Sequence, residues 1–265
     1  MNSVKPIGRG GVGHRRLVAG LRRRVGQVTR YLNHGIIRTF RPLPSIRLDE
    51  VASGPIDVVE PIRDDICLPP YLGPTDHDDF VPLMRIAGYC RPRVIFEFGT
   101  AHGNSVANLC RQCPDARVYT VNAPVELQTG EVVTFELSTS EIGRVYRAHG
   151  FADRVTQILQ NSMSLDLSRT FSGPVVDLAI IDACHDAEYV LNDFSKIRPY
   201  ISPTGIVLFH DTHPSMTAHL DGSYQACVRL RTLGFDIRHV EGTWWAIWKR
   251  EWNPDSVATR TSRAF

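Results

Sequence analysis

Residues 93–105 read Arg-Val-Ile-Phe-Glu-Phe-Gly-Thr-Ala-His-Gly-Asn-Ser, and this stretch decides the fold. The five residues before the first glycine are apolar except for Glu97, as expected of a strand buried on both faces. Gly99 and Gly103 follow, and Asn104 is a good residue for starting a helix. A strand that runs into a glycine turn and a helix opens a doubly wound α/β fold and places free N–H groups beside a ligand.

The alternation of strands and helices continues along the chain. Apolar runs predict further strands at 117–122, 155–159, 177–182, 206–209, 235–240 and 244–248. Periodic segments predict helices at 76–90, 104–113, 139–149, 188–198 and 224–232, and residues 203–205 are typical of a turn. The sequence therefore predicts an α/β protein with a doubly wound, mostly parallel, seven-stranded, Rossmann-like sheet that ends in an antiparallel hairpin.

The charges are unevenly distributed along the 265 residues. Residues 1–48 hold 11 of the 30 Lys and Arg residues and no acid, so 19 bases face 28 acids in the rest of the chain. Outside this basic arm, the charge gives no reason to expect nucleic-acid binding. We expect a lead-in at 49–75, the α/β domain at 76–250 and a loose tail at 251–265.

The basic arm contains apolar residues at helical spacing, which predict an amphipathic helix over residues 15–38. Such a helix suits an anionic membrane surface or an acidic partner, or it packs on its own domain or on a second copy in a homo-oligomer. The sequence has no apolar run typical of a membrane span or a secretory signal. The six cysteines are scattered, and Cys110 and Cys113 are expected to be buried free thiols. These features predict a cytoplasmic protein, either free or peripheral to a membrane.

The glycine turn has the spacing Glu97-x-Gly99-x-Ala101-x-Gly103, which limits the classes of ligand that it is expected to bind. A nicotinamide-binding turn usually has three glycines and an acid about 20 residues later, and only two of the glycines fit here. An acid before the turn can instead accept a hydrogen bond from a cationic ligand group. A nicotinamide-dependent oxidoreductase remains an alternative at this point.

Over residues 76–250 the chain resembles the class I S-adenosylmethionine-dependent methyltransferases, in particular a bacterial group of small-molecule O-methyltransferases. The resemblance rests on five motifs in order. They are Glu97-Phe-Gly-Thr-Ala-His-Gly-Asn-Ser105, Val118-Tyr-Thr-Val-Asn122, Asn161-Ser162, Asp177-Leu-Ala-Ile-Ile-Asp182-Ala-Cys-His185-Asp-Ala-Glu-Tyr189-Val, and Gly205-Ile-Val-Leu-Phe-His210-Asp211.

The resemblance implies S-adenosylmethionine as the cofactor. The turn would hold its methionine part, Asn122 would face the ribose, and Asn161 with Ser162 would face the adenine. Family members usually carry an acid at the position of Asn122. The implied cofactor-binding residues are Glu97, Gly99, Thr100, Ala101, Gly103, Ser105, Asn122, Asn161, Ser162 and Asp182.

Methyl transfer to an oxygen often requires removal of a proton, and histidine titrates near neutral pH. His185 and His210 are therefore the candidate bases, and Asp211 completes the candidate catalytic set. A related group of O-methyltransferases binds Mg²⁺ at positions that correspond to Asp182, His210 and Asp211. This likeness implies a divalent cation, Mg²⁺ or Mn²⁺, although an imidazole ligand disfavours Mg²⁺.

The expected function is O-methylation of a small molecule such as a sugar or a secondary metabolite. The alternative is a non-catalytic methyltransferase-like domain that docks to a membrane or a partner through its basic helix.

Overall fold

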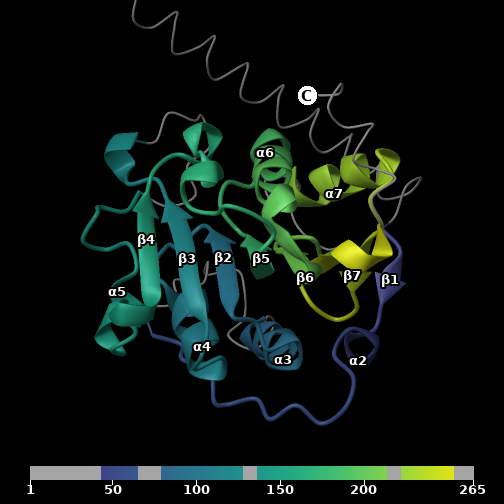
Figure 1. Ribbon diagram of the computed structural model, residues 1–265, viewed down its shortest axis with the longest axis horizontal. Helices are drawn as coiled ribbons and strands as arrows, with labels where there is room; N and C mark the ends of the chain where they lie inside the picture. The colour runs from purple at the N-terminus through teal and green to yellow at the C-terminus, as the bar shows by residue number, and fades with distance from the viewer. Residues whose placement is uncertain (1–42, 65–78, 128–135, 214–221, 254–265) are drawn as a thin grey trace, which may run out of the picture.

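The structure is a computed structural model that describes residues 43–64, 79–127, 136–213 and 222–253. The expected helix at 15–38 lies outside the described residues. One sheet with the strand order β1-β7-β8-β6-β5-β2-β3-β4 forms the centre of the described part (Figure 1). The strands are β1 Ser45–Ile46, β2 Val94–Phe98, β3 Arg117–Asn122, β4 Val155–Leu159, β5 Val176–Ile181, β6 Ile201–Phe209, β7 Ile237–Val240 and β8 Ala246–Lys249.

The middle of the sheet is parallel, from β4 at one edge through β3, β2 and β5 to β6. β8 pairs antiparallel with both β6 and β7, so the closing hairpin is confirmed. The doubly wound α/β class is confirmed as well. Because strand β2 lies between β3 and β5, the chain leaves it in one direction and later returns on its other side. Ligands bind at such a switch point.

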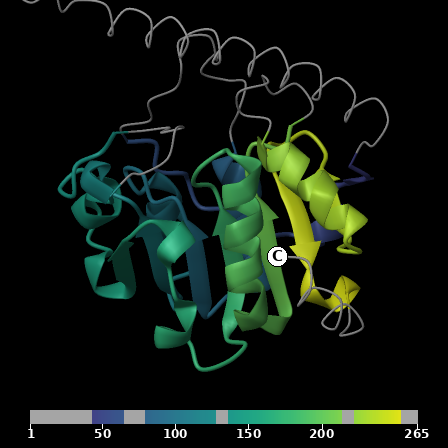
Figure 2. The same cartoon turned by 90° about the horizontal axis from the view of Figure 1, so that it is seen from above.

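Helices cover both faces of the sheet (Figure 2). They are α2 Leu48–Val51, α3 Phe80–Cys90, α4 Asn104–Gln112, α5 Arg144–Ala148, α6 Ala187–Ile197 and α7 Gly222–Thr232. Alternation along β2 sends Ile95 into an apolar cluster with residues of α3 and α4, whereas Phe96 and Phe98 join a cluster with residues of α6 and α7. Glu97 follows the alternation of Ile95, which directs it towards α4.

Within the described ranges, the sheet has eight strands and not the seven predicted. The additional strand, β1, pairs parallel with β7 at the edge. Its two residues are too few to show a periodic pattern, so the sequence could not reveal it. In the stretch predicted as a lead-in, Val51 and Ala52 are fully buried and Ile62 is nearly so, in the same cluster as Leu83. Residues 49–64 therefore contribute to the core.

Three further local predictions were wrong. Helix α5 begins at Arg144 and not at 139 or 140, because Gly143 takes the left-handed φ of 73° and donates its N–H to Ala101 O. The residues of the expected turn, 203–205, are part of strand β6. The pairing between β6 and β5 is irregular at this place. At the start of the expected loose tail, residues 251 and 252 belong to a 3-10 turn, Arg250–Trp252, and Asn253 Oδ1 accepts from Trp248 Nε1 at 2.7 Å; the rest of the tail lies outside the described residues.

Cys110 and Cys113 are buried and free, as predicted, and burial raises the pKa of each thiol to about 11. Within the described ranges, the helices are too short or too polar to cross a membrane.

Candidate active site

The glycine turn brings the end of β2 directly against the end of β5. Gly99 has a φ of 99°, in the left-handed region that favours glycine. A Cβ atom added to it would lie 1.9 Å from the carbonyl oxygen of Asp182. Gly103, with a φ of 88°, precedes α4, and its position carries no side chain that could cap this helix; among the described residues no side-chain cap is found. The first N–H groups of α4 are therefore available to a ligand.

Glu97 lies beneath this turn and is fully buried. One of its carboxylate oxygens accepts from Ser105 Oγ, and the other accepts from Thr120 Oγ1 at 2.7 Å. Thr120 Oγ1 also lies 2.7 Å from Thr100 Oγ1, which accepts from Gln157 Nε2 at 2.9 Å. Burial raises the pKa of Glu97 to about 7. The carboxyl group thus links the turn to α4 and β3.

Asn122 braces the same turn from the end of β3. Its Oδ1 accepts from the N–H of Ala101 at 3.1 Å, and its Nδ2 donates to Ala123 O at 3.0 Å. An amide oxygen has a second lone pair, so Asn122 can still accept from a ligand hydroxyl. At the end of β4, Asn161 Oδ1 accepts from Met163 N and caps the turn that contains Ser162. Both asparagines therefore order the strand-end loops.

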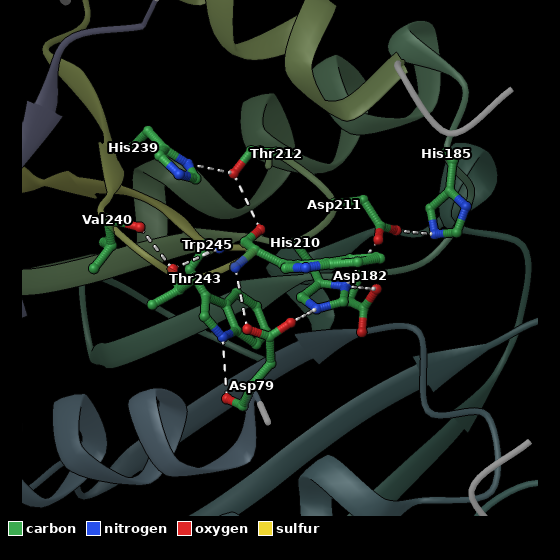
Figure 3. A network of polar contacts seen from close by, with 11 residues as sticks. Asp79, Asp182, His185, His210, Asp211, Thr212, His239, Val240, Thr243 and Trp245 are labelled. Carbon is green, nitrogen blue, oxygen red and sulfur yellow. Dashed lines mark hydrogen bonds and ion pairs between the residues drawn. The ribbon is translucent and has the colours of Figure 1, made fainter. Parts of the chain in front are cut away.

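The other predicted residues meet at the ends of β5 and β6 (Figure 3). Asp182, His185 and Asp211 each offer a ligand atom within 4.8 Å of the others. His185 Nε2 lies 2.6 Å from Asp211 Oδ2, and His210 Nδ1 lies 3.2 Å from Asp182 Oδ1 and 3.4 Å from Asp211 Oδ1. Asp211 has a φ of 58°, which costs an L-residue roughly 1–2 kcal/mol. Strain of this kind is often found at functional sites.

The opposite charges in this cluster stabilise one another. Burial alone would lower the pKa of His210, but the carboxylates of Asp182 and Asp211 raise it well above its ordinary value. Burial would raise the pKa of Asp211, but His185 and His210 outweigh it and hold the pKa well below the ordinary value. Burial also opposes the charged form of His185, whose pKa Asp211 nevertheless raises. The cluster therefore favours ionised acids and protonated imidazoles.

Asp79 belongs to this cluster but was missed by the sequence analysis. Its Oδ2 accepts from His210 Nε2 at 3.0 Å, and its Oδ1 accepts from the N–H of Trp244 at 3.1 Å. Asp79 lies within the segment predicted as a helix, where an acid is usually solvated. The only local signal was an acid near a helix start, and that pattern normally indicates a cap.

The donor set also fits a divalent cation. Two carboxylates and an imidazole nitrogen lie at distances from one another that ligands of a single ion adopt. Of the predicted metal ligands, Asp182 and Asp211 come together with His210, and His185 lies within the same group. Mixed nitrogen and oxygen ligands suit Mn²⁺ better than Mg²⁺.

The comparisons with known proteins match this part of the chain. Residues 96–212 match a family model described as a methyltransferase domain. The chain is similar to cofactor-bound Rv0187 from MTB, with 22% identity, coverage of 69% of this chain and 84% of that chain, and a TM-score of 0.47. It is similar to the O-methyltransferase TomG from Streptomyces achromogenes, involved in tomaymycin synthesis and in complex with SAM, with 20% identity, 62% and 75% coverage, and a TM-score of 0.42.

A third similar structure is the O-methyltransferase from Bacillus cereus in complex with SAH, with 18% identity, 63% and 77% coverage, and a TM-score of 0.46. A comparison with the sequences of curated proteins gives no match. The matched region begins within β2 and ends just after Asp211, so it includes the glycine turn and the acid–histidine cluster except for Asp79. Over residues 96–212, the chain therefore matches a methyltransferase-domain family in its sequence.

Proposed function

We propose that the protein is a methyltransferase that uses S-adenosylmethionine and transfers the methyl group to an oxygen atom of a small molecule, such as a sugar or a secondary metabolite. The observation that carries the proposal is the contact between Gly99 and the carbonyl group of Asp182. It joins the ligand-binding turn to the acid–histidine cluster. A methyl donor in the turn would then lie on the same side of the sheet as the proton acceptor in the cluster, as an aligned displacement requires.

The cofactor would lie across the carboxyl ends of β2, β3 and β4. The free N–H groups at the start of α4 suit the methionine carboxylate. Asn122 would accept from one ribose hydroxyl through the second lone pair of its Oδ1, and the loop with Asn161 and Ser162 would face the adenine. Glu97 supports these contacts from beneath, through Ser105 and Thr120.

The neutral form of His185 is the better candidate for the general base. Because Asp211 raises the pKa of His185, this neutral form becomes more abundant as the pH rises above the range in which histidine ordinarily titrates. Asp211 accepts from its Nε2, which leaves Nδ1 without a partner among the described residues. Both nitrogens of His210 face carboxylates. Bound S-adenosylmethionine would supply the methyl group as a sulfonium, and His185 would take the proton that the acceptor hydroxyl loses. Asp211 orients the ring and stabilises its protonated form.

Asp182, His210 and Asp211 would hold a divalent cation. When bound, such a cation lowers the pKa of an acceptor hydroxyl and helps to orient it.

Calorimetric titration with S-adenosylmethionine tests the cofactor, and incubation with labelled cofactor and a panel of hydroxylated acceptors tests the reaction. We expect binding in the micromolar range and transfer of label to an oxygen. Absence of binding up to millimolar cofactor would refute the proposal, and so would label transferred only to nitrogen, sulfur or carbon acceptors.

A further inference from the structure

Asp79 stands immediately before α3, at the position where an aspartate usually caps a helix. Its carboxylate makes no capping hydrogen bond to the helix, although such a bond contributes typically about 1 kcal/mol. The side chain is turned instead towards His210 Nε2 and the N–H of Trp244. Asp79 thus binds residues that are distant in the sequence and leaves the helix uncapped. Such a choice indicates that the site needs these contacts.

The contact with Asp79 decides which nitrogen of His210 faces the cluster. A carboxylate at Nε2 keeps a proton on that nitrogen, so Nδ1 is left to face Asp182 and Asp211. Trp245 holds the ring in place, with the two ring centroids 4.4 Å apart, and Trp245 Nε1 donates to Asp79 O at 3.1 Å. The orientation of the imidazole is therefore fixed by packing and by hydrogen bonds (Figure 3).

Histidines that bind metal ions usually show this arrangement, in which the nitrogen away from the metal donates to a carboxylate that fixes the tautomer and raises the basicity of the ligand. Nδ1 of His210 lies 3.2 and 3.4 Å from the two carboxylate oxygens. Adjacent ligands around an ion with bonds of about 2.1 Å lie about 3 Å apart. Small adjustments would place all three atoms around one ion.

We propose that Asp79 is a positioning residue for a divalent cation, in a site where His210 binds the cation through Nδ1 beside Asp182 and Asp211 and makes the site prefer Mn²⁺ to Mg²⁺. This proposal deepens the proposed function and rests on it for its catalytic meaning. Binding of the metal itself can be measured without any acceptor or cofactor.

The test is a titration of metal-free, full-length protein with Mn²⁺, followed by the electron paramagnetic resonance signal of free Mn²⁺, with Mg²⁺ as competitor. The wild type is expected to bind one Mn²⁺ per chain and to bind Mg²⁺ at least tenfold more weakly. Asp79→Asn is expected to weaken Mn²⁺ binding by about 10- to 100-fold. Its amide oxygen can still accept from Trp244, but its NH₂ group then faces His210 Nε2.

Asp64→Asn is the matched control, because Asp64 Oδ2 pairs with His149 Nε2 at 2.7 Å on the surface. It removes the same kind of Asp–His contact and should leave Mn²⁺ affinity unchanged. His210→Asp replaces the imidazole by an oxygen ligand and should shift the preference towards Mg²⁺. Circular dichroism melting establishes that each variant is folded.

Three results would overturn the proposal. They are a wild type that binds S-adenosylmethionine but not Mn²⁺, a folded Asp79→Asn variant with unchanged Mn²⁺ affinity, and a His210→Asp variant with an unchanged metal preference. The first result would leave the proposed cofactor intact and would mean that the His210 imidazolium itself fills the space between the carboxylates. Loss of S-adenosylmethionine binding with Mn²⁺ binding retained would instead count against the proposed function alone.

Discussion

Replacing Gly99 with alanine probes the contact that joins the two halves of the site. The new Cβ atom would lie 1.9 Å from Asp182 O, 2.5 Å from its carbonyl carbon and 2.8 Å from the Cα atom of Ala183. All three atoms belong to the backbone at the end of β5, so no flexible side chain can move aside. The turn and the strand end must separate, and Asp182 must shift with them.

A matched control separates two contributions to the expected loss of stability in Gly99→Ala. Gly234 has a φ of 97°, close to the 99° of Gly99, and a Cβ atom added there meets none of the described residues within 4 Å. Gly234→Ala should therefore show only the cost of a left-handed L-residue, roughly 1–2 kcal/mol. Gly99→Ala adds the cost of overpacking, roughly 1–3 kcal/mol. The expected loss in the free energy of unfolding is about 2–5 kcal/mol for Gly99→Ala.

The assays are urea unfolding of both variants and calorimetric titration with S-adenosylmethionine. Gly99→Ala should also lower the rate of methyl transfer on the order of 10²-fold, because a displacement near 1 Å misaligns the reacting groups. Gly234→Ala should bind and react as the wild type does. If the two variants lose the same stability and Gly99→Ala binds the cofactor normally, the close contact with Asp182 does not constrain the site.

Three further predictions concern residues of the site. Because the folded-state pKa of Glu97 is about 7 against an ordinary 4.5, the folded protein holds this proton more tightly than the unfolded chain does. The stability gained from this tighter proton binding is therefore complete below about pH 4.5 and is lost as the pH rises to 7. Glu97→Gln should remove up to about 3 kcal/mol of this pH dependence in urea unfolding, and equal slopes for the two proteins would contradict the assignment. His185→Asn should lower the rate of transfer about 10²- to 10⁴-fold with an unchanged cofactor affinity, and a rate near that of the wild type would exclude His185 as the base. Asn122→Ala should lose about 1 kcal/mol of stability, because the N–H of Ala101 loses its acceptor, and should bind the cofactor more weakly in calorimetry; unchanged values for both would show that Asn122 does not brace the turn.

The sequence predicts strands β2, β3 and β4 well, because each is a short, mostly apolar run that is followed by polar residues. β2, β3 and β4 have the predicted bounds. Helix α5 was placed too early, because the conformation of Gly143 depends on a hydrogen bond to Ala101, which comes 42 positions earlier in the chain. Local propensity carries no information about such a contact.

Local sequence patterns also reveal some residues of the site and not others. Asp182, His210 and Asp211 directly follow buried strands, so the order of the elements places them at one edge of the sheet. Asp79 has its partners 131 and 165 positions away, at His210 and Trp244. Nothing in the residues around Asp79 distinguishes it from an ordinary helix cap. Its role becomes visible only when the ends of β6 and β8 are placed beside α3.

The pairing of β1 with β7 has a consequence for the order of events during synthesis. Ser45 pairs with His239, and the N–H of Leu43 donates to the hydroxyl of Tyr224, 181 positions later. The early segment can complete this edge of the sheet only after almost the whole domain has left the ribosome. Contacts over such separations form slowly because a long loop must close first. Until then, the backbone groups that pair residues 45–46 with β7 lack these partners, in a chain that begins with its most basic stretch.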